Sequence, residues 1–123
     1  MNIAVIGSRE FKDKNFVFQT LSGFFDNQLS YGNISSDYVL VSGGAKGVDS
    51  WGEEFWKKHS GECIIFKPEW DKYGKSAGFI RNKLIIEKSN RIIAFWNGIS
   101  KGTKHSIDLA ISMDKPVDIY VRN

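Results

Sequence analysis

The chain has 123 residues and a single cysteine, Cys63, so no disulfide can form within it. Cys63 lies in the apolar run ECIIF, where a lone cysteine is typically a buried thiol. Proteins without disulfides are typical of reducing compartments. No stretch approaches the roughly 20 apolar residues of a membrane span, and no charged segment precedes a long apolar one at the N-terminus. These absences predict a soluble, cytoplasmic protein.

Clusters of metal ligands and of basic residues are also missing. The two histidines and the lone cysteine have no metal-ligand spacing, so the sequence requires no cofactor, although Mg²⁺ could accompany a phosphate ligand. The 17 Lys and Arg residues outnumber the 14 Asp and Glu residues and give a net charge of +3, but they are scattered along the chain. Dedicated nucleic-acid binders usually gather their basic residues. We therefore do not expect a nucleic-acid partner.

What the chain does contain is a regular alternation of apolar runs and amphipathic segments. The apolar runs predict strands at 2–6, 38–42, 62–66 and 91–96, with a last strand after Pro116, and helical spacing predicts helices at 14–29, 48–59, 78–89 and 103–113. Strands that are apolar throughout are typical of a parallel sheet covered on both faces. We predict a single α/β domain over residues 1–123, a Rossmann-like three-layer sandwich with five parallel strands in the order 3-2-1-4-5.

Some details of these elements are also predicted. Asp13 is expected to cap the first helix, and residues 30–37, rich in Ser, Asn and Gly, are expected to form a loop. Apolar spacing in the last two helices places Leu84 and Ile111 among the residues that face the core.

Four loops lead from a strand to the next helix, at 7–13, 42–49, 67–78 and 97–103, and each carries glycine, a basic residue or both. In a parallel sheet all such loops open at one edge, and ligands bind there where the strand order reverses. Glycine lets the backbone approach a ligand closely, and loop amides at a helix N-terminus favour an anion. The alternative is that the glycines only make tight turns. The predicted ligand contacts are Gly7, Ser8, Arg9, Ser42, Gly43, Gly44, Ala45, Gly47, Asp49, Arg81, Asn82, Gly98, Lys101, Gly102 and Thr103.

Several of these residues have two interpretations. Arg9 either contacts a phosphate or a base or lies on a solvated surface, and Arg81 either grips a phosphate or lies on a solvated helix face. Asp49 either binds a ribose hydroxyl or is favoured in the first turn of its helix by the dipole. The hydroxyl of Thr103 either caps the last helix or binds a phosphate oxygen. The aromatic residues near the same edge either stack on a base or pack against the protein body; they are Trp70, Tyr73 and Trp96.

Four motifs in a fixed order carry a family resemblance: GSREFKD, SGGAKGVD, DKYGKSAGFIRN and GISKGTKHSIDLA. Together they resemble the YspA-like, YpsA-related branch of the SLOG superfamily. That superfamily also contains SMF/DprA DNA-processing proteins, LOG phosphoribohydrolases and sensors of NAD-derived signalling nucleotides. The resemblance implies a Rossmann-like fold, a nucleotide-type ligand at the glycine loops, and a homo-oligomer of two or more copies.

One departure from this pattern bears on catalysis. LOG enzymes carry the loop PGGxGTxxE, whose glutamate helps to cleave an N-glycosidic bond. The matching stretch here is WNGISKGTKHSID, without a glutamate after Thr103. An enzyme is therefore not favoured. If the chain is one, the candidate catalytic carboxylates are Glu10, Asp49 and Asp108, although Asp108 could instead pair with Lys104 one turn earlier.

The sequence thus predicts a protein that binds a nucleotide or nucleotide-derived molecule, such as an NAD- or ADP-ribose-derived signal, as a sensor or sequestering protein. Two alternatives stay open: a LOG-type N-glycosidase or phosphoribohydrolase, and a DprA-like nucleic-acid binder.

Overall fold

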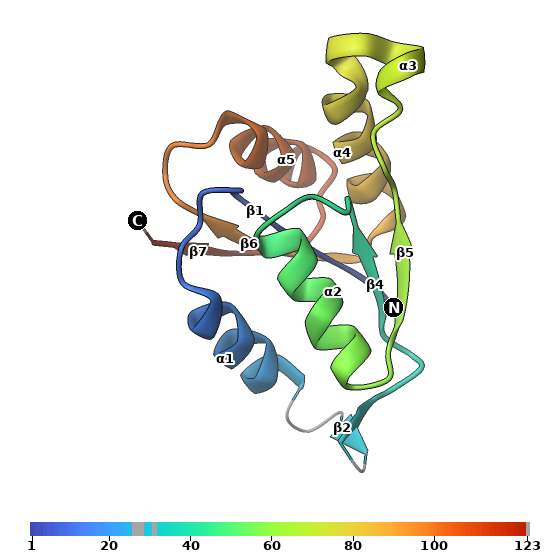
Figure 1. The fold of residues 1–123 in the computed structure, drawn as a ribbon, viewed down its shortest axis with the longest axis vertical. Coiled ribbons are helices and arrows are strands. Elements are labelled where there is room, and N and C mark those ends of the chain that lie inside the picture. The colour runs from blue at the N-terminus through green and yellow to red at the C-terminus, as the bar shows by residue number, and fades with distance from the viewer. Residues whose placement is uncertain (26–28, 31, 123) are drawn as a thin grey trace.

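The computed structural model describes residues 1–25, 29–30 and 32–122. Its centre is a five-stranded parallel sheet (Figure 1), in which every pairing is parallel. The strands are β1 (Asn2–Gly7), β4 (Val39–Ser42), β5 (Glu62–Ile65), β6 (Arg91–Trp96) and β7 (Val117–Val121), in the spatial order β5-β4-β1-β6-β7. Counted along the chain, this order is 3-2-1-4-5, which confirms the prediction.

Four helices cover the sheet in two layers. The helices are α1 (Lys14–Phe25), α2 (Val48–Lys58), α4 (Ala77–Lys88) and α5 (Lys101–Ser112). One core cluster joins Ile3 and Val5 of β1 to α1 and α2, and a second joins Ala4 and Ile6 to α4 and α5. Successive strand residues point to opposite faces, so a strand covered on both sides must be apolar at every position.

The described part of the chain also contains several smaller elements. A short helix, α3 (Trp70–Tyr73), and a single 3-10 turn, η2 (Gly74–Ser76), lead into α4 and form an arm that projects beyond it (Figure 1). The hairpin of β2 (Leu29–Ser30) and β3 (Asn33–Ile34) follows α1. This hairpin corrects two predictions, because residues 30–37 were expected to be a loop and the first helix was expected to reach residue 29. Residues 26–28 and 31 lie outside the described part.

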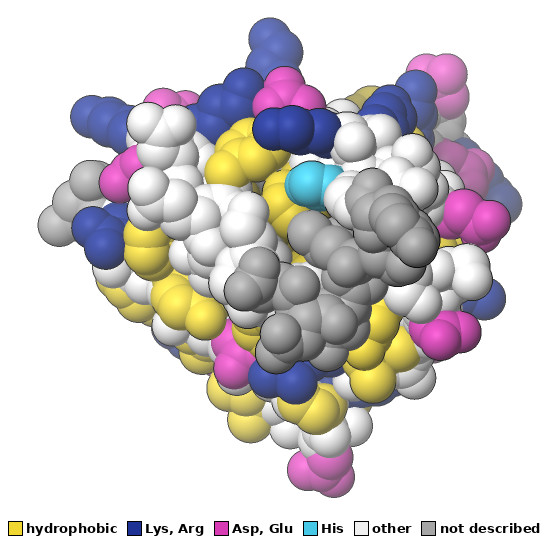
Figure 2. All heavy atoms as spheres, turned by 90° about the horizontal axis from the view of Figure 1, so that it is seen from below, with side chains coloured by type: hydrophobic (Ala, Val, Ile, Leu, Met, Phe, Trp, Pro, Cys, Tyr) yellow, Lys and Arg dark blue, Asp and Glu magenta, His cyan; other side chains and the backbone are white. Residues whose placement is uncertain are grey.

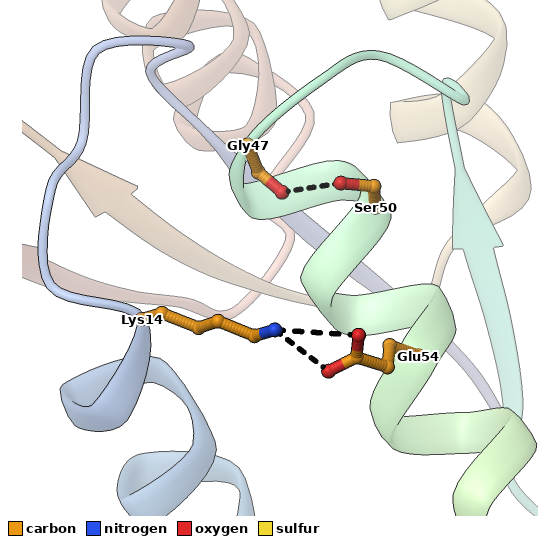
Figure 3. Close-up of polar contacts among 4 residues, drawn as sticks. All are labelled: Lys14, Gly47, Ser50 and Glu54. Atoms are coloured by element: carbon orange, nitrogen blue, oxygen red, sulfur yellow. Dashed lines mark hydrogen bonds and ion pairs between the residues drawn. The ribbon is translucent and has the colours of Figure 1, made fainter.

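The first two helices also make polar contacts. The backbone amide of Phe16 donates to Asp13 Oδ1 at 3.0 Å, which confirms Asp13 as the cap of α1. Lys14 Nζ lies 3.1 Å from Glu54 Oε2 and so links α1 to α2 (Figure 3). Both of these charged side chains are about half exposed, so the ion pair contributes little to stability.

Burial differs from expectation at three positions. Cys63 is only partly buried, because β5 is an edge strand that pairs with β4 alone. Leu84 and Ile111 are exposed, whereas α4 buries Ala77, Arg81 and Ile85. Arg81 occupies a buried position on α4, so the spacing of apolar residues alone predicted the wrong buried face for this helix.

Charge is dispersed at the end of the sheet opposite the carboxyl ends of the strands. Among the residues coloured in Figure 2, Lys and Arg side chains alternate with acidic ones around the rim and form no continuous basic patch.

In the described part of the chain, no helix is long and apolar enough to cross a membrane.

Candidate functional site

A cavity of about 520 Å³ lies at the carboxyl edge of the sheet. Its walls come from the loop after β1, the start of α2, the first turns of α4, and the segment from the end of β6 into α5. The strand order reverses between β1 and β6, where ligands of such sheets bind, and the volume falls within the usual range for small-molecule sites. The predicted contact residues that line it are Gly7, Ser8, Arg9, Ala45, Asp49, Arg81, Asn82, Gly102 and Thr103, with Trp70 and Glu10.

One end of the cavity is a cluster of hydroxyl groups at the start of α5. Ser8 Oγ donates to Asn97 Oδ1 at 3.2 Å and lies 3.4 Å from Thr103 Oγ1. Asn97 Oδ1 also accepts from the amide of Ser100 at 2.8 Å, and Ser100 Oγ accepts from the amide of Thr103. Ser100 is therefore the cap of α5, which corrects the idea that Thr103 caps it. The Thr103 hydroxyl instead faces Ser8 and Ser100 across the end of the helix.

The cavity lining also contains two buried charged residues. Arg81 is 8% exposed and donates from Nη1 to the carbonyl oxygen of Gly43 at 2.7 Å and from Nε to Asn82 Oδ1 at 2.8 Å. Asp49 is 9% exposed, and its Oδ2 accepts from the amide of Ala45 at 3.3 Å. Arg81 thereby ties the loop after β4 to α4.

Burial changes the protonation of both groups. It raises the pKa of Asp49 from 3.8 to about 6, although the Ala45 amide and the positive charge of Arg81 oppose this shift. It lowers the pKa of Arg81, although the nearby Asp49 carboxylate opposes that shift. The cavity thus contains a carboxyl group that titrates close to neutral pH.

We expect Asp49→Asn to stabilise the fold above pH 6. A raised pKa means that the folded state binds this proton more tightly than the unfolded state does. Stability from this group is therefore present at low pH and is lost as pH rises from about 4 to about 6. The shift corresponds to on the order of 2–3 kcal/mol. Urea unfolding at several pH values would show the variant's advantage at pH 8 shrinking toward pH 4, and an advantage that does not vary with pH would contradict this account.

Apolar side chains occupy part of the mouth of the cavity, beside the exposed charged residues Arg9, Glu10 and Lys75. Trp70 on α3 and Phe79 on α4 are each 51% exposed, and Ile99 is 79% exposed. The Phe79 ring packs edge-on against His105 of α5, with ring centroids 4.9 Å apart. Lys75, in the turn η2, also reaches the cavity.

Several lining residues were not predicted from the sequence; they include Phe79, Ile99, Lys75, Asn97 and Ser100. The N-cap signal of a serine three residues before Thr103 could have identified Ser100. An exposed aromatic residue on a helix carries no comparable signal, so nothing in the sequence marked Phe79.

Four residues of the 42–49 loop lie outside the cavity lining, contrary to prediction. The Oγ atom of Ser42 donates to Glu53 Oε2 at 2.8 Å. Gly43 is buried between Arg81 and Asp49, and Gly44, at φ +69°, faces Ile65 and Lys67. Gly47, at φ +82°, begins α2, and Ser50 Oγ donates to its carbonyl oxygen at 2.9 Å (Figure 3). These three glycines therefore shape the loop, which was the alternative to ligand contact.

The loop before α5 also places two predicted contacts outside the lining. Gly98, at φ +83°, makes the turn after β6, and Lys101 is exposed at the start of α5. Only Gly102 and Thr103 of the predicted set reach the cavity from this segment.

Two of the three aromatic residues predicted to stack on a base lie outside the cavity lining. Trp96 packs in the core cluster on the α4–α5 face and donates from Nε1 to the carbonyl oxygen of Ser100 at 3.0 Å, so it braces the loop before α5. Tyr73 does not line the cavity, and Lys72 Nζ lies 5.1 Å from the centroid of its ring. Trp70 alone of the three reaches the cavity.

The candidate catalytic carboxylates separate into two groups. Glu10 and Asp49 line the cavity. Asp108 is exposed and accepts from Lys104 Nζ at 2.7 Å one turn earlier on α5, away from the cavity. Asp108 is therefore removed from the set of candidates.

Residues 1–73 match the family model described as "YAcAr: YspA, cpYpsA-related SLOG family". No curated protein matches the sequence. Among solved structures, the chain is similar to DNA processing protein A from Helicobacter pylori, with a TM-score of 0.71 and 21% identity. The match covers 97% of this chain and 64% of that chain, and at this identity it shows the fold.

This comparison overturns the expectation that nucleic acid is not a partner. The Helicobacter pylori protein that shares the fold is described as binding single-stranded DNA. The expectation rested on the scatter of basic residues along the chain, but Arg9, Lys75 and Arg81, which are distant in sequence, line one cavity. The scatter of basic residues along the sequence therefore did not predict that three of them line one cavity.

Proposed function

Because the chain belongs to the YspA, cpYpsA-related SLOG family, we propose that its cavity binds a nucleotide or nucleotide-derived molecule and that it acts as a sensor or sequestering protein. One observation carries this proposal: a hydroxyl-rich helix N-terminus, buried charged side chains and exposed aromatic side chains meet in a single cavity. These three environments correspond to the phosphate, sugar and base of a nucleotide.

The phosphate is proposed to bind at the start of α5. Gly102 brings the backbone to the cavity there, and Ser8, Ser100 and Thr103 offer hydroxyl groups. A helix N-terminus with free amides favours an anion. The charged residues of the lining are three basic ones (Arg9, Lys75 and Arg81) against two acidic ones (Glu10 and Asp49), which gives a net charge of +1. This small excess suits a ligand with few negative charges.

The base is proposed to bind at the aromatic side chains in the mouth of the cavity. Trp70 and Phe79 both line the cavity and are half exposed, so a flat ring can reach them. Stacking of a base on an aromatic side chain contributes about 1–3 kcal/mol and tolerates different bases. We therefore expect the aromatic side chains of the mouth to contribute to affinity for any base. We expect the buried polar groups, Asp49 and Arg81, to determine which nucleotide is selected.

The proposal predicts that the protein retains a nucleotide and releases it intact. The protein would be incubated with adenine mononucleotides, NAD, ADP-ribose and cyclic derivatives, with and without Mg²⁺. After removal of unbound material and denaturation, chromatography would identify the released compound. Failure to retain any of these compounds above a bovine albumin control would overturn the proposal.

The same experiment tests the hydrolase alternative. Asp49 favours it, because a buried carboxyl group with a pKa of about 6 in the cavity is the kind of group that acts as a general acid. Conversion of a nucleotide to free base and ribose phosphate, lost in Asp49→Asn, would establish an enzyme.

Single-stranded DNA is a second candidate ligand, favoured by the likeness of fold to a protein that binds it. In that case a nucleotide within the strand would occupy the cavity, and flanking phosphates would contact basic residues outside it. Because phosphate contacts release counterions, the affinity for an oligodeoxynucleotide would fall steeply with salt. A mononucleotide that binds as tightly as the oligomer would instead favour the small-molecule proposal.

A further inference from the structure

Asp49 and Arg81 are more than nine-tenths buried, yet their contacts in the described part of the chain do not use all of their hydrogen-bonding capacity. The Asp49 carboxylate accepts from the Ala45 amide at Oδ2 and is also stabilised by the Gly43 amide, and a carboxylate can accept further hydrogen bonds. Arg81 donates from Nη1 and Nε, whereas Nη2 has no acceptor. Among the described residues no fully enclosed side-chain nitrogen or oxygen lacks a partner, so Arg81 Nη2 is accessible. Both residues line the cavity.

The two charged groups lie close together but do not form a direct ion pair. Among the described residues, no nitrogen of Arg81 lies within 4.0 Å of an Asp49 oxygen, although each group shifts the pKa of the other. Gly43 lies between them: a Cβ atom there would lie 2.7 Å from Arg81 Nη1 and 3.0 Å from Asp49 Oδ2. The absence of a side chain at Gly43 is therefore what lets the two groups stand side by side.

Such a pair selects a particular kind of ligand group. A carboxylate oxygen beside a guanidinium nitrogen offers one acceptor and one donor in a site with little water. A phosphate would be repelled by Asp49, and an ammonium group would be repelled by Arg81. A hydroxyl group fits both, because its proton is donated to the carboxylate while its oxygen accepts from the guanidinium.

We infer that Asp49 and Arg81 form a subsite that binds the hydroxyl groups of ribose, so that the cavity selects ribonucleotides over 2′-deoxyribonucleotides. The inference rests on the proposed function and deepens it. It also separates the two candidate ligands, since a strand of DNA has no 2′-hydroxyl for this subsite.

The test is calorimetric titration of the wild-type protein with AMP, GMP, CMP and UMP, each compared with its 2′-deoxy form. Loss of a hydrogen bond to a buried charged group corresponds to about a ten- to hundredfold loss of affinity. We expect that ratio for the ribonucleotide that binds most tightly. In Asp49→Asn the ratio should fall, because a neutral amide oxygen is a weaker acceptor than a buried carboxylate. Asp108→Asn, the same change at an exposed aspartate outside the cavity, should keep the wild-type ratio.

The outcomes separate the inference from the proposal on which it rests. Equal binding of ribo and deoxy forms by the wild-type protein would overturn the subsite and leave nucleotide binding intact. An unchanged ratio in a folded Asp49→Asn variant would also overturn it, because the carboxylate would then make no contribution to reading the hydroxyl. If no ribo or deoxy mononucleotide binds, the proposed function itself fails for this class of ligand, and the subsite fails with it. The comparison in the wild-type protein does not depend on whether the variant folds.

Discussion

Replacing Gly102 by leucine is expected to abolish nucleotide binding, with a loss of affinity of more than a hundredfold, while the protein stays folded. Gly102 lines the cavity in the first turn of α5, and a Cβ atom there would meet no other atom within 4 Å. The leucine side chain would therefore extend into open space without a clash and fill the region proposed for the phosphate. Leucine also favours a helix more than glycine does. Calorimetric titration and thermal unfolding would measure the two effects separately.

Gly23→Leu is the matched control. Gly23 also lies in a helix, α1, and a Cβ atom at that position also meets nothing within 4 Å, but the residue is not part of the cavity lining. We expect this variant to bind as the wild-type protein does and to be at least as stable. A folded Gly102→Leu variant with unchanged affinity would show that the ligand binds elsewhere.

Gly7→Ala is expected to destabilise the fold by about 3 kcal/mol, the upper end of the usual range for overpacking. A Cβ atom at Gly7 would lie 2.5 Å from the carbonyl oxygen of Phe95 and 2.6 Å from Val48 Cγ2. Gly7 ends β1 opposite Phe95 of β6, so relief of the clash requires two central strands or α2 to move apart. Urea unfolding would measure the loss, which is large because domains are typically stable by only about 5–15 kcal/mol.

The same substitution at Gly23 should have the opposite sign. Alanine has space there and a higher helix propensity, so Gly23→Ala should stabilise α1 by up to about 1 kcal/mol. If Gly7→Ala proved as stable as Gly23→Ala, the close approach between β1 and α2 would be wrong.

The sheet could be predicted because its signals are continuous. The first four strands of the sheet lie in apolar runs, and each is followed by a helix with recognisable spacing, so the order of elements and the sheet topology could be predicted. The hairpin of β2 and β3 could not be predicted in the same way, because its strands have two residues each and lie in a stretch rich in Ser, Asn and Gly. The buried face of α4 was hard to predict for another reason. A buried face is recognised from the helical spacing of apolar residues, and the buried Arg81 interrupts that spacing.

The candidate site could be predicted in position but only partly in composition. The loops at the carboxyl edge indicated where the cavity lies, since the topology brings them together. Which glycines reach it depends on the curvature of each loop, and that curvature turned Gly44 toward Ile65 while leaving Gly102 at the cavity. Phe79 and Ile99 were missed because exposed apolar residues on a helix or loop have no sequence signal of their own.

The buried carboxyl group of Asp49 also has a consequence for engineering. A library of variants selected only for survival of heating would enrich replacements of this residue, because removing a buried charge raises stability above pH 6. The selected variants would have a higher melting temperature but would lack one of the buried polar groups that line the cavity. Thermostable variants of this protein should therefore be evolved with position 49 held constant.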